Sequence, residues 1–113
     1  MRHARLGDTA VEVTELSLGT AAIGNLFTPV DHADAIGTVD TAWRAGIRAF
    51  DTAPHYGLGL AERRLGAALR ERPRAEYVVS TKVGRLLAAV PGWRRLRLDG
   101  LLPEHVPLPL GSG

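Results

Sequence analysis

The chain has 113 residues, of which 45% are hydrophobic and 23% are charged, and this is enough apolar material for one domain with a buried core. It contains no cysteine, which excludes disulfide bonds and thiolate metal sites, and its net charge is only +2. Up to residue 82, ten basic side chains are interleaved with ten acidic ones. We therefore expect no nucleic acid partner, because binding to phosphate backbones needs a clustered basic face.

The first residues carry Arg2 and Arg5 and lead into no long apolar run. A secretory signal and a membrane span both require such a run. We therefore expect a cytoplasmic protein without a membrane partner.

Short β elements are predicted at the start of the chain. Residues 3–14 are typical of a β-hairpin, because residues 7–9 (Gly-Asp-Thr) supply a turn and Val11 and Val13 alternate with polar neighbours. Residues 16–20 are expected to form a short apolar strand, and residues 25–30 the loop that follows it.

A helix is predicted next. Asp31 can cap its N-terminus, and Ile36, Val39 and Trp43 recur at the spacing of one helical face. Gly46 stands where a left-handed residue is expected to end the helix.

The same alternation of strand and helix then repeats. Residues 47–52 indicate a strand, residues 60–71 a second helix that ends before Pro73, and residues 77–82 a third strand. The face of the second helix that we expect to be buried carries Leu65, Ala68 and Leu69.

This order is the pattern of parallel βαβ units, which build either an open doubly wound sheet or a closed barrel. The dinucleotide fingerprint of the open fold, G-x-G-x-x-G, is missing after the first strand. Residues 57–59 (Gly-Leu-Gly) match only part of it, and they follow the second strand.

The character of the chain changes after Leu87. Residues 88–113 contain four of the seven prolines and sustain no periodicity, so we expect an irregular or disordered tail. Two regions follow from this: residues 1–87, which carry the α/β pattern, and the divergent tail.

Three residues could share one chemical task. Asp51 and Lys82 end the second and third strands, and Tyr56 stands in the loop after Asp51. In a parallel barrel these positions meet at the carboxyl ends of the strands. A tyrosine hydroxyl can give a proton to a carbonyl oxygen that receives a hydride, and a neighbouring ammonium helps by stabilising the phenolate. Lys82 is the chain's one lysine beside thirteen arginines, which suggests that an arginine would not serve there.

Several motifs together resemble the aldo-keto reductase family. Residues 49–57 (AFDTAPHYG) are similar to the family's signature around its catalytic Asp and Tyr, and residues 80–84 (STKVG) to its lysine strand. Residues 5–7 (RLG) and 18–20 (LGT) match its hairpin and first strand. The longer string from Pro54 to Glu62 resembles the bacterial aldose dehydrogenases, which oxidise sugars such as fucose. The resemblance runs from about residue 5 to residue 87.

The resemblance implies a fold and a set of roles. The fold would be a partial (β/α)₈ TIM barrel, made of the hairpin and the first three strands. Tyr56 would be the general acid and base, and Lys82 would tune its acidity. Asp51 would orient Lys82 and would itself lie near the nicotinamide ribose of NAD(P). Gly19 and Thr20 would border the nicotinamide. The residues expected to line the substrate pocket are Asn25, Phe27 and His55, and no metal is expected.

The resemblance also leaves positions without a counterpart. The family's fourth catalytic residue is a histidine after the fourth strand, and His105 stands among prolines with no strand before it. The family's main contacts to the cofactor phosphates come from later strands as well.

The functional expectation is hydride transfer between NAD(P) and an aldose or another small carbonyl or alcohol. Taken singly, Asp51 could cap a turn, Tyr56 could be a surface aromatic, and Lys82 a surface charge. The alternative functions are a truncated, inactive fragment, or a small interaction module without enzyme activity of its own. Self-association through the unpaired edge of the third strand is a further expectation.

Overall fold

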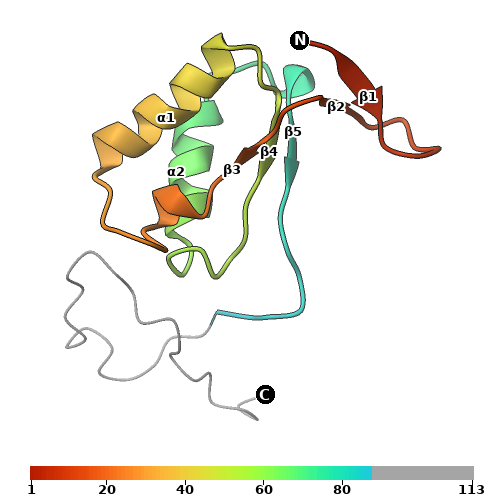
Figure 1. Cartoon of the computed structure of the whole chain (residues 1–113). Helices are drawn as coiled ribbons and strands as arrows, with labels where there is room; N and C mark the ends of the chain where they lie inside the picture. The colour runs from red at the N-terminus through yellow and green to blue at the C-terminus, as the bar shows by residue number, and fades with distance from the viewer. Residues whose placement is uncertain (88–113) are drawn as a thin grey trace.

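The computed structural model describes residues 1–87 as an α/β arrangement with two small sheets (Figure 1). The strands β1 (His3–Arg5) and β2 (Glu12–Thr14) form an antiparallel hairpin. The strands β3 (Leu18–Gly19), β4 (Ala49–Asp51) and β5 (Val78–Ser80) form a parallel sheet in the order β3-β4-β5. The predictions made for the tail, residues 88–113, lie outside the described residues.

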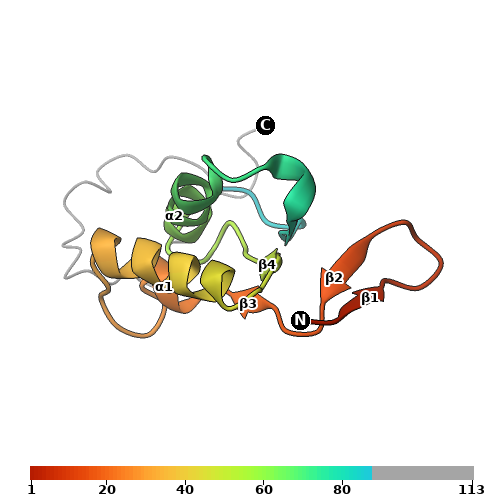
Figure 2. The ribbon, with the colours of Figure 1, turned by 90° about the horizontal axis from the view of Figure 1, so that it is seen from above.

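Two helices cover one face of the parallel sheet. The helix α1 (His32–Arg44) follows β3, and α2 (Leu60–Leu69) follows β4. Both views show them side by side, with the hairpin projecting on the far side of the sheet (Figures 1 and 2). Two short 3₁₀ turns, η1 (Ala22–Gly24) and η2 (Arg74–Glu76), complete the connections. Within the described residues, no helix has the length and apolar character that crossing a membrane requires.

The helix α1 begins and ends at the predicted residues. The Asp31 carboxylate accepts the backbone N–H of Asp34 at 2.8 Å, which satisfies a free donor of the first turn. Gly46 adopts φ +100°, a left-handed conformation that ends the helix. The predicted face does meet the core: Val39 is buried, and Ile36 and Trp43 pack against the core while half-buried. Ala35 and Ala42, which were not predicted, are buried as well.

The core lies between the helices and the sheet. Phe50 on β4 is 2% exposed and packs among small and medium side chains of both helices. The predicted face of α2 is confirmed, since all three of its expected residues are buried. The buried residues of this cluster are Ile23, Ala35, Val39, Ala42, Phe50, Ala61, Leu65, Ala68 and Leu69.

The hairpin is tied to the sheet through Thr14. The buried Thr14 hydroxyl donates to the Leu16 carbonyl at 2.6 Å and accepts the backbone N–H of Arg48 at 3.1 Å. This threonine therefore fixes the end of β2 against the segment that leads into β4. At the other side of the sheet, β5 pairs only with β4 within residues 1–87, and its Val79 is 40% exposed.

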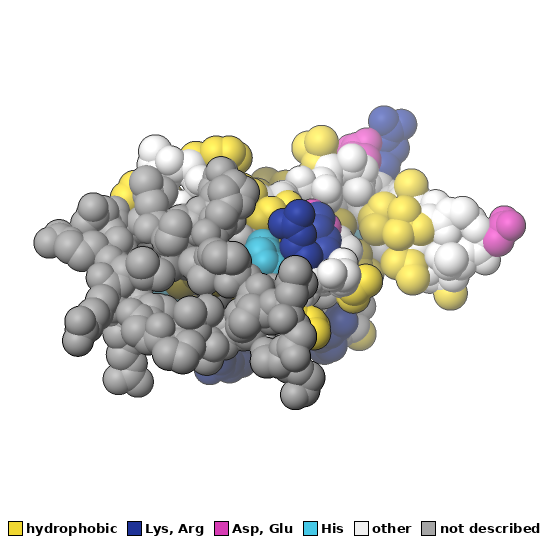
Figure 3. Space-filling model, turned by 90° about the horizontal axis from the view of Figure 1, so that it is seen from below, with side chains coloured by type: hydrophobic (Ala, Val, Ile, Leu, Met, Phe, Trp, Pro, Cys, Tyr) yellow, Lys and Arg dark blue, Asp and Glu magenta, His cyan; other side chains and the backbone are white. Residues whose placement is uncertain are grey.

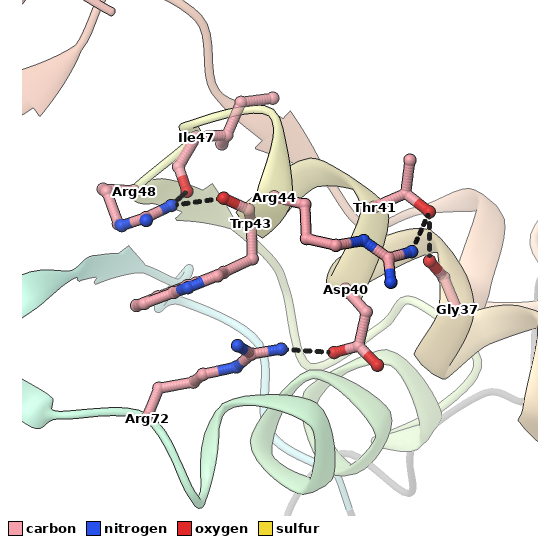
Figure 4. A network of polar contacts seen from close by, with 8 residues as sticks. All are labelled: Gly37, Asp40, Thr41, Trp43, Arg44, Ile47, Arg48 and Arg72. Atoms are coloured by element: carbon pink, nitrogen blue, oxygen red, sulfur yellow. Dashed lines mark hydrogen bonds and ion pairs between the residues drawn. The ribbon is translucent and has the colours of Figure 1, made fainter.

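An aromatic and arginine stack closes the C-terminal end of α1 (Figure 4). The guanidinium carbon of Arg48 lies 3.7 Å from the ring centroid of Trp43, and that of Arg72 lies 4.9 Å from it. Arg48 also donates to the carbonyl oxygens of Trp43 and Ile47 at 2.6 and 2.9 Å, and Arg72 pairs with Asp40 at 2.8 Å. The Trp43 carbonyl at the helix end, which also accepts the backbone N–H of Gly46 at 3.0 Å, thus gains a cationic donor.

We predict that Trp43→Ala lowers the free energy of unfolding by about 2–4 kcal/mol, slightly less than removal of a fully buried tryptophan. The change removes the ring on which both guanidinium groups lie and its edge contact with Tyr77, at 6.0 Å between centroids. The matched control is Arg44→Ala on the same helix, whose exposed side chain reaches only Thr41 and should cost less than about 0.5 kcal/mol. Equal losses in chemical denaturation would contradict the role of the stack.

Candidate active site

The carboxyl ends of β4 and β5 bring three of the predicted residues together. The Lys82 Nζ donates to Asp51 Oδ2 at 2.9 Å and to the Thr52 carbonyl at 3.1 Å. It also lies 5.1 Å from the centroid of the Tyr56 ring. Viewed from below, basic, acidic and histidine side chains lie side by side on this face of the molecule (Figure 3). The predicted juxtaposition of Asp51, Tyr56 and Lys82 is therefore present.

Asp51 is held by hydrogen bonds from both of the strands that flank β4. From β5, the Ser80 hydroxyl donates to Asp51 Oδ1 at 2.6 Å. From the end of β3, Thr20 donates to the Asp51 carbonyl with its backbone N–H at 3.0 Å and with its hydroxyl at 2.9 Å. Hydrogen bonds thus fix both the backbone and the carboxylate of this residue.

These contacts shift the pKa values of Asp51 and Lys82 in opposite directions. The Ser80 hydroxyl, followed by Lys82, holds the pKa of the Asp51 carboxyl below its usual 3.8. The bond to Asp51 raises the pKa of the Lys82 ammonium above its usual 10.5. Because the carboxyl pKa is lowered by folding, its contribution to the free energy of unfolding is present above about pH 4 and is lost as the pH falls further. Because the ammonium pKa is raised by folding, its contribution is present up to about pH 10 and is lost above that. Both groups are therefore charged at neutral pH.

The loop that carries Tyr56 is packed backbone against backbone. Gly57 and Gly59 have φ of +70° and +93°, and Leu58 between them has φ +50°. A Cβ at Gly24 would lie 2.6 Å from the Tyr56 carbonyl oxygen, and a Cβ at Gly57 would lie 2.2 Å from the Gly24 carbonyl oxygen. Only glycine fits at either position, and the contact fixes the Tyr56 backbone against η1.

A buried arginine, which the sequence analysis did not identify, reinforces this contact. Arg64 on α2 is 8% exposed, and its Nη1 donates to the Ile23 carbonyl at 2.8 Å and to Asn25 Oδ1 at 3.2 Å. Asn25 Oδ1 also accepts the backbone N–H of Val30 at 2.9 Å. The Asn25 amide oxygen therefore holds its own loop, so a bound molecule would meet other parts of this residue.

The remaining predicted site residues differ in their exposure. Gly19 is exposed, whereas Thr20 is fully enclosed, so its side chain supports Asp51 from within. Phe27 is 71% exposed, and His55 lies half-buried beside Tyr56. Their expected contacts with cofactor and substrate stay predictions. Among the described residues, no cluster of three or more acidic or histidine side chains could hold a metal ion.

Comparisons with known proteins agree on one family. A family model described as the aldo/keto reductase family matches residues 15–99. D-threo-aldose 1-dehydrogenase from Pseudomonas sp is 52% identical over 95 residues, which are 84% of this chain and 29% of that protein. Pyridoxal 4-dehydrogenase from Microbacterium luteolum is 52% identical over 109 residues, which are 96% of this chain and 30% of that protein.

The solved structures give the same result. An aldo-keto reductase from Bacillus halodurans, in its holo form, superimposes with a TM-score of 0.69 and 33% identity, over 78% of this chain and 28% of that one. The chain therefore spans about three tenths of the length of the relatives that it matches. The family match continues to residue 99, beyond the boundary at residue 87 that the proline pattern predicted, and that boundary stays a prediction.

We predict that Gly24→Ala destabilises the protein by about 1–3 kcal/mol, because the new methyl group would collide with the Tyr56 backbone. The matched control is Gly66→Ala on α2, where a methyl group would meet nothing within 4 Å. That change should instead stabilise the helix by up to about 1 kcal/mol. Denaturant unfolding of both variants measures the difference, and changes of the same sign would refute the close packing of the two loops.

Proposed function

The chain belongs to the aldo/keto reductase family of oxidoreductases, and we propose that it carries the proton-transfer group of an NAD(P)-linked dehydrogenase. The sequence resemblance to this family is thereby confirmed. The observation that carries the proposal is the position of the Lys82 ammonium, bonded to Asp51 at 2.9 Å and lying 5.1 Å from the ring of Tyr56.

The proposed mechanism assigns Tyr56 to move a proton. In the oxidising direction its oxygen takes the proton of the substrate hydroxyl, and in the reducing direction it returns one to the carbonyl oxygen. The Lys82 ammonium stabilises negative charge on the tyrosine oxygen through its proximity. Asp51 keeps that ammonium charged and directed, and its own backbone is fixed by Thr20.

The residues present fit a nicotinamide at this edge of the sheet. Gly19 is exposed, and a methyl group in place of its α hydrogen would meet nothing within 4 Å. Gly19 is also the register partner of Asp51, so this open space adjoins the proton-transfer group. When bound, NAD(P) supplies the acceptor or donor of the hydride. We propose that the Gly19 backbone and Asp51 border it.

The parallel sheet is proposed to be the first three strands of a (β/α)₈ barrel. Its order β3-β4-β5 places successive strands side by side, with α1 and α2 on one face, as in a barrel wall. In such a barrel the other face of β4 and β5, which carries Asp51 and Ser80, would line the interior mouth.

We propose an aldose as the substrate, oxidised at a hydroxyl group. The proposal draws on the D-threo-aldose 1-dehydrogenase among the relatives, and on a proton acceptor that needs no metal to act on an alcohol. Pyridoxal is the alternative that the second relative suggests. Phe27 and His55 are the side chains proposed to contact the substrate.

The test is a comparison of two tyrosine variants. Tyr56→Phe removes the proposed proton carrier and should lower the turnover of an aldose with NAD(P)⁺ by about 10²–10⁴, while the affinity for NAD(P)H changes less than about twofold. The matched control is Tyr77→Phe, since Tyr77 is the other tyrosine and packs by its ring edge against Trp43 and Phe50. Its turnover should stay close to that of the unchanged chain.

The assay uses the 113-residue chain first, with fluorescence titration of NAD(P)H beside the turnover. It then uses a fusion in which residues 1–87 replace the matching segment of the Pseudomonas dehydrogenase. Turnover by the fusion but not by the chain would favour the expected inactive fragment while preserving the role of Tyr56. Turnover retained in the Tyr56→Phe fusion would exclude that role.

A further inference from the structure

Ser80 lies directly opposite Asp51 in the parallel sheet. The register of β4 and β5 pairs Ala49 with Val78, Phe50 with Val79, and Asp51 with Ser80. Side chains at paired positions project from the same face of a sheet. The backbone therefore brings the Ser80 hydroxyl to the Asp51 carboxylate, at 2.6 Å from Oδ1.

The two oxygens of the carboxylate have different partners. Oδ1 accepts the Ser80 hydroxyl, and Oδ2 accepts the Lys82 ammonium at 2.9 Å. The torsion that rotates a carboxylate about its last carbon–carbon bond is broad and roughly two-fold, so the backbone alone does not fix which way the oxygens point. A donor on each oxygen removes that freedom.

The ion pair by itself is a weak restraint. The side chains of Lys82 and Asp51 are 51% and 42% exposed, and ion pairs open to water hold their geometry poorly. The Ser80 side chain is exposed as well, but its short hydroxyl bond costs less side-chain entropy than the ion pair, because serine has few rotamers and its backbone is already fixed by strand pairing. Ser80 is thus better suited than Lys82 to set the carboxylate plane.

We propose that Ser80 is a positioning residue for the proton-transfer group: its hydroxyl holds Oδ1 of Asp51, so that Oδ2 stays directed at the Lys82 ammonium. The inference rests on the proposed function for its purpose, but the geometry that it describes can be measured without any turnover. The hydroxyl donates to Asp51 and acts through it.

The neighbouring residue supplies a matched control. Thr81 directly follows the strand, is exposed like Ser80, and also carries a hydroxyl, but it donates to Glu62 Oε1 at 2.6 Å. Ser80 and Thr81 are adjacent, and removal of either hydroxyl deletes one short hydrogen bond to a carboxylate. Only the Ser80 bond reaches Asp51.

The experiment follows the Asp51 carboxyl by ¹³C NMR in the 113-residue chain labelled at the aspartate carboxyl carbons, with the Asp51→Asn spectrum to identify the signal. Ser80→Ala should raise the titration midpoint of Asp51 by roughly half a unit to one unit, because the carboxylate loses a donor. Ser80→Thr, which keeps a hydroxyl, should restore the midpoint, and Thr81→Ala should leave it unchanged.

The amide spectrum of each variant reports whether the fold is intact. If Ser80→Ala does not fold, Ser80→Cys takes its place, since a thiol has a similar size and is a weaker donor. It should give a smaller rise in the midpoint. An unmoved Asp51 midpoint in the folded Ala or Cys variant, or an equal rise in Thr81→Ala, would overturn the proposal. Since neither cofactor nor substrate is present, failure of the proposed dehydrogenase function would not alter this result.

Discussion

The site depends on the bond between Lys82 and Asp51, and this exposed ion pair depends in turn on the groups that hold Asp51. It joins the carboxyl ends of two neighbouring strands, and it places a cation beside the only tyrosine in the loop between them. The register of β4 and β5 brings the two residues to the same edge, and Thr20 and Ser80 hold Asp51 in place. A shift of one residue in that register would turn Asp51 to the helix-covered face, where a carboxylate would lie among apolar side chains.

The two ends of the parallel sheet differ in their side chains. At the amino ends of β4 and β5, Arg48, Trp43 and Tyr77 pack face to edge and close the helix terminus. At the carboxyl ends, polar groups stay partly exposed around Asp51. This division agrees with the general behaviour of parallel βα folds, in which one end contributes stability and the other carries the chemistry.

Much of this could be predicted from the sequence, because hydrophobic spacing and capping residues act locally. Asp31 and Gly46 predicted the ends of α1, and Asp51 ends its strand as predicted. Lys82 lies two residues beyond β5, which ends at Ser80 and is shorter than the predicted strand. Ser80 and Arg64 were missed for different reasons. The partner of Ser80 depends on strand register, which the alternation of polar and apolar residues does not give. An arginine on a helix is expected to face water, but Arg64 is buried because the Ile23 carbonyl accepts its hydrogen bond. On α1 the buried alanines Ala35 and Ala42 were missed, because their small side chains give a weak hydrophobic signal in the sequence.

The measurement that tests the central claim most directly is the titration of Lys82. It is the one lysine of the chain, so selective ¹³C labelling of lysine gives a single side-chain signal without assignment. The structure predicts a midpoint above 10.5 that falls toward 10.5 in Asp51→Asn, because the raised pKa of Lys82 arises first from its bond to Asp51. A midpoint at or below 10.5 in the unchanged chain, or one that Asp51→Asn does not move, would contradict the pairing of these two residues.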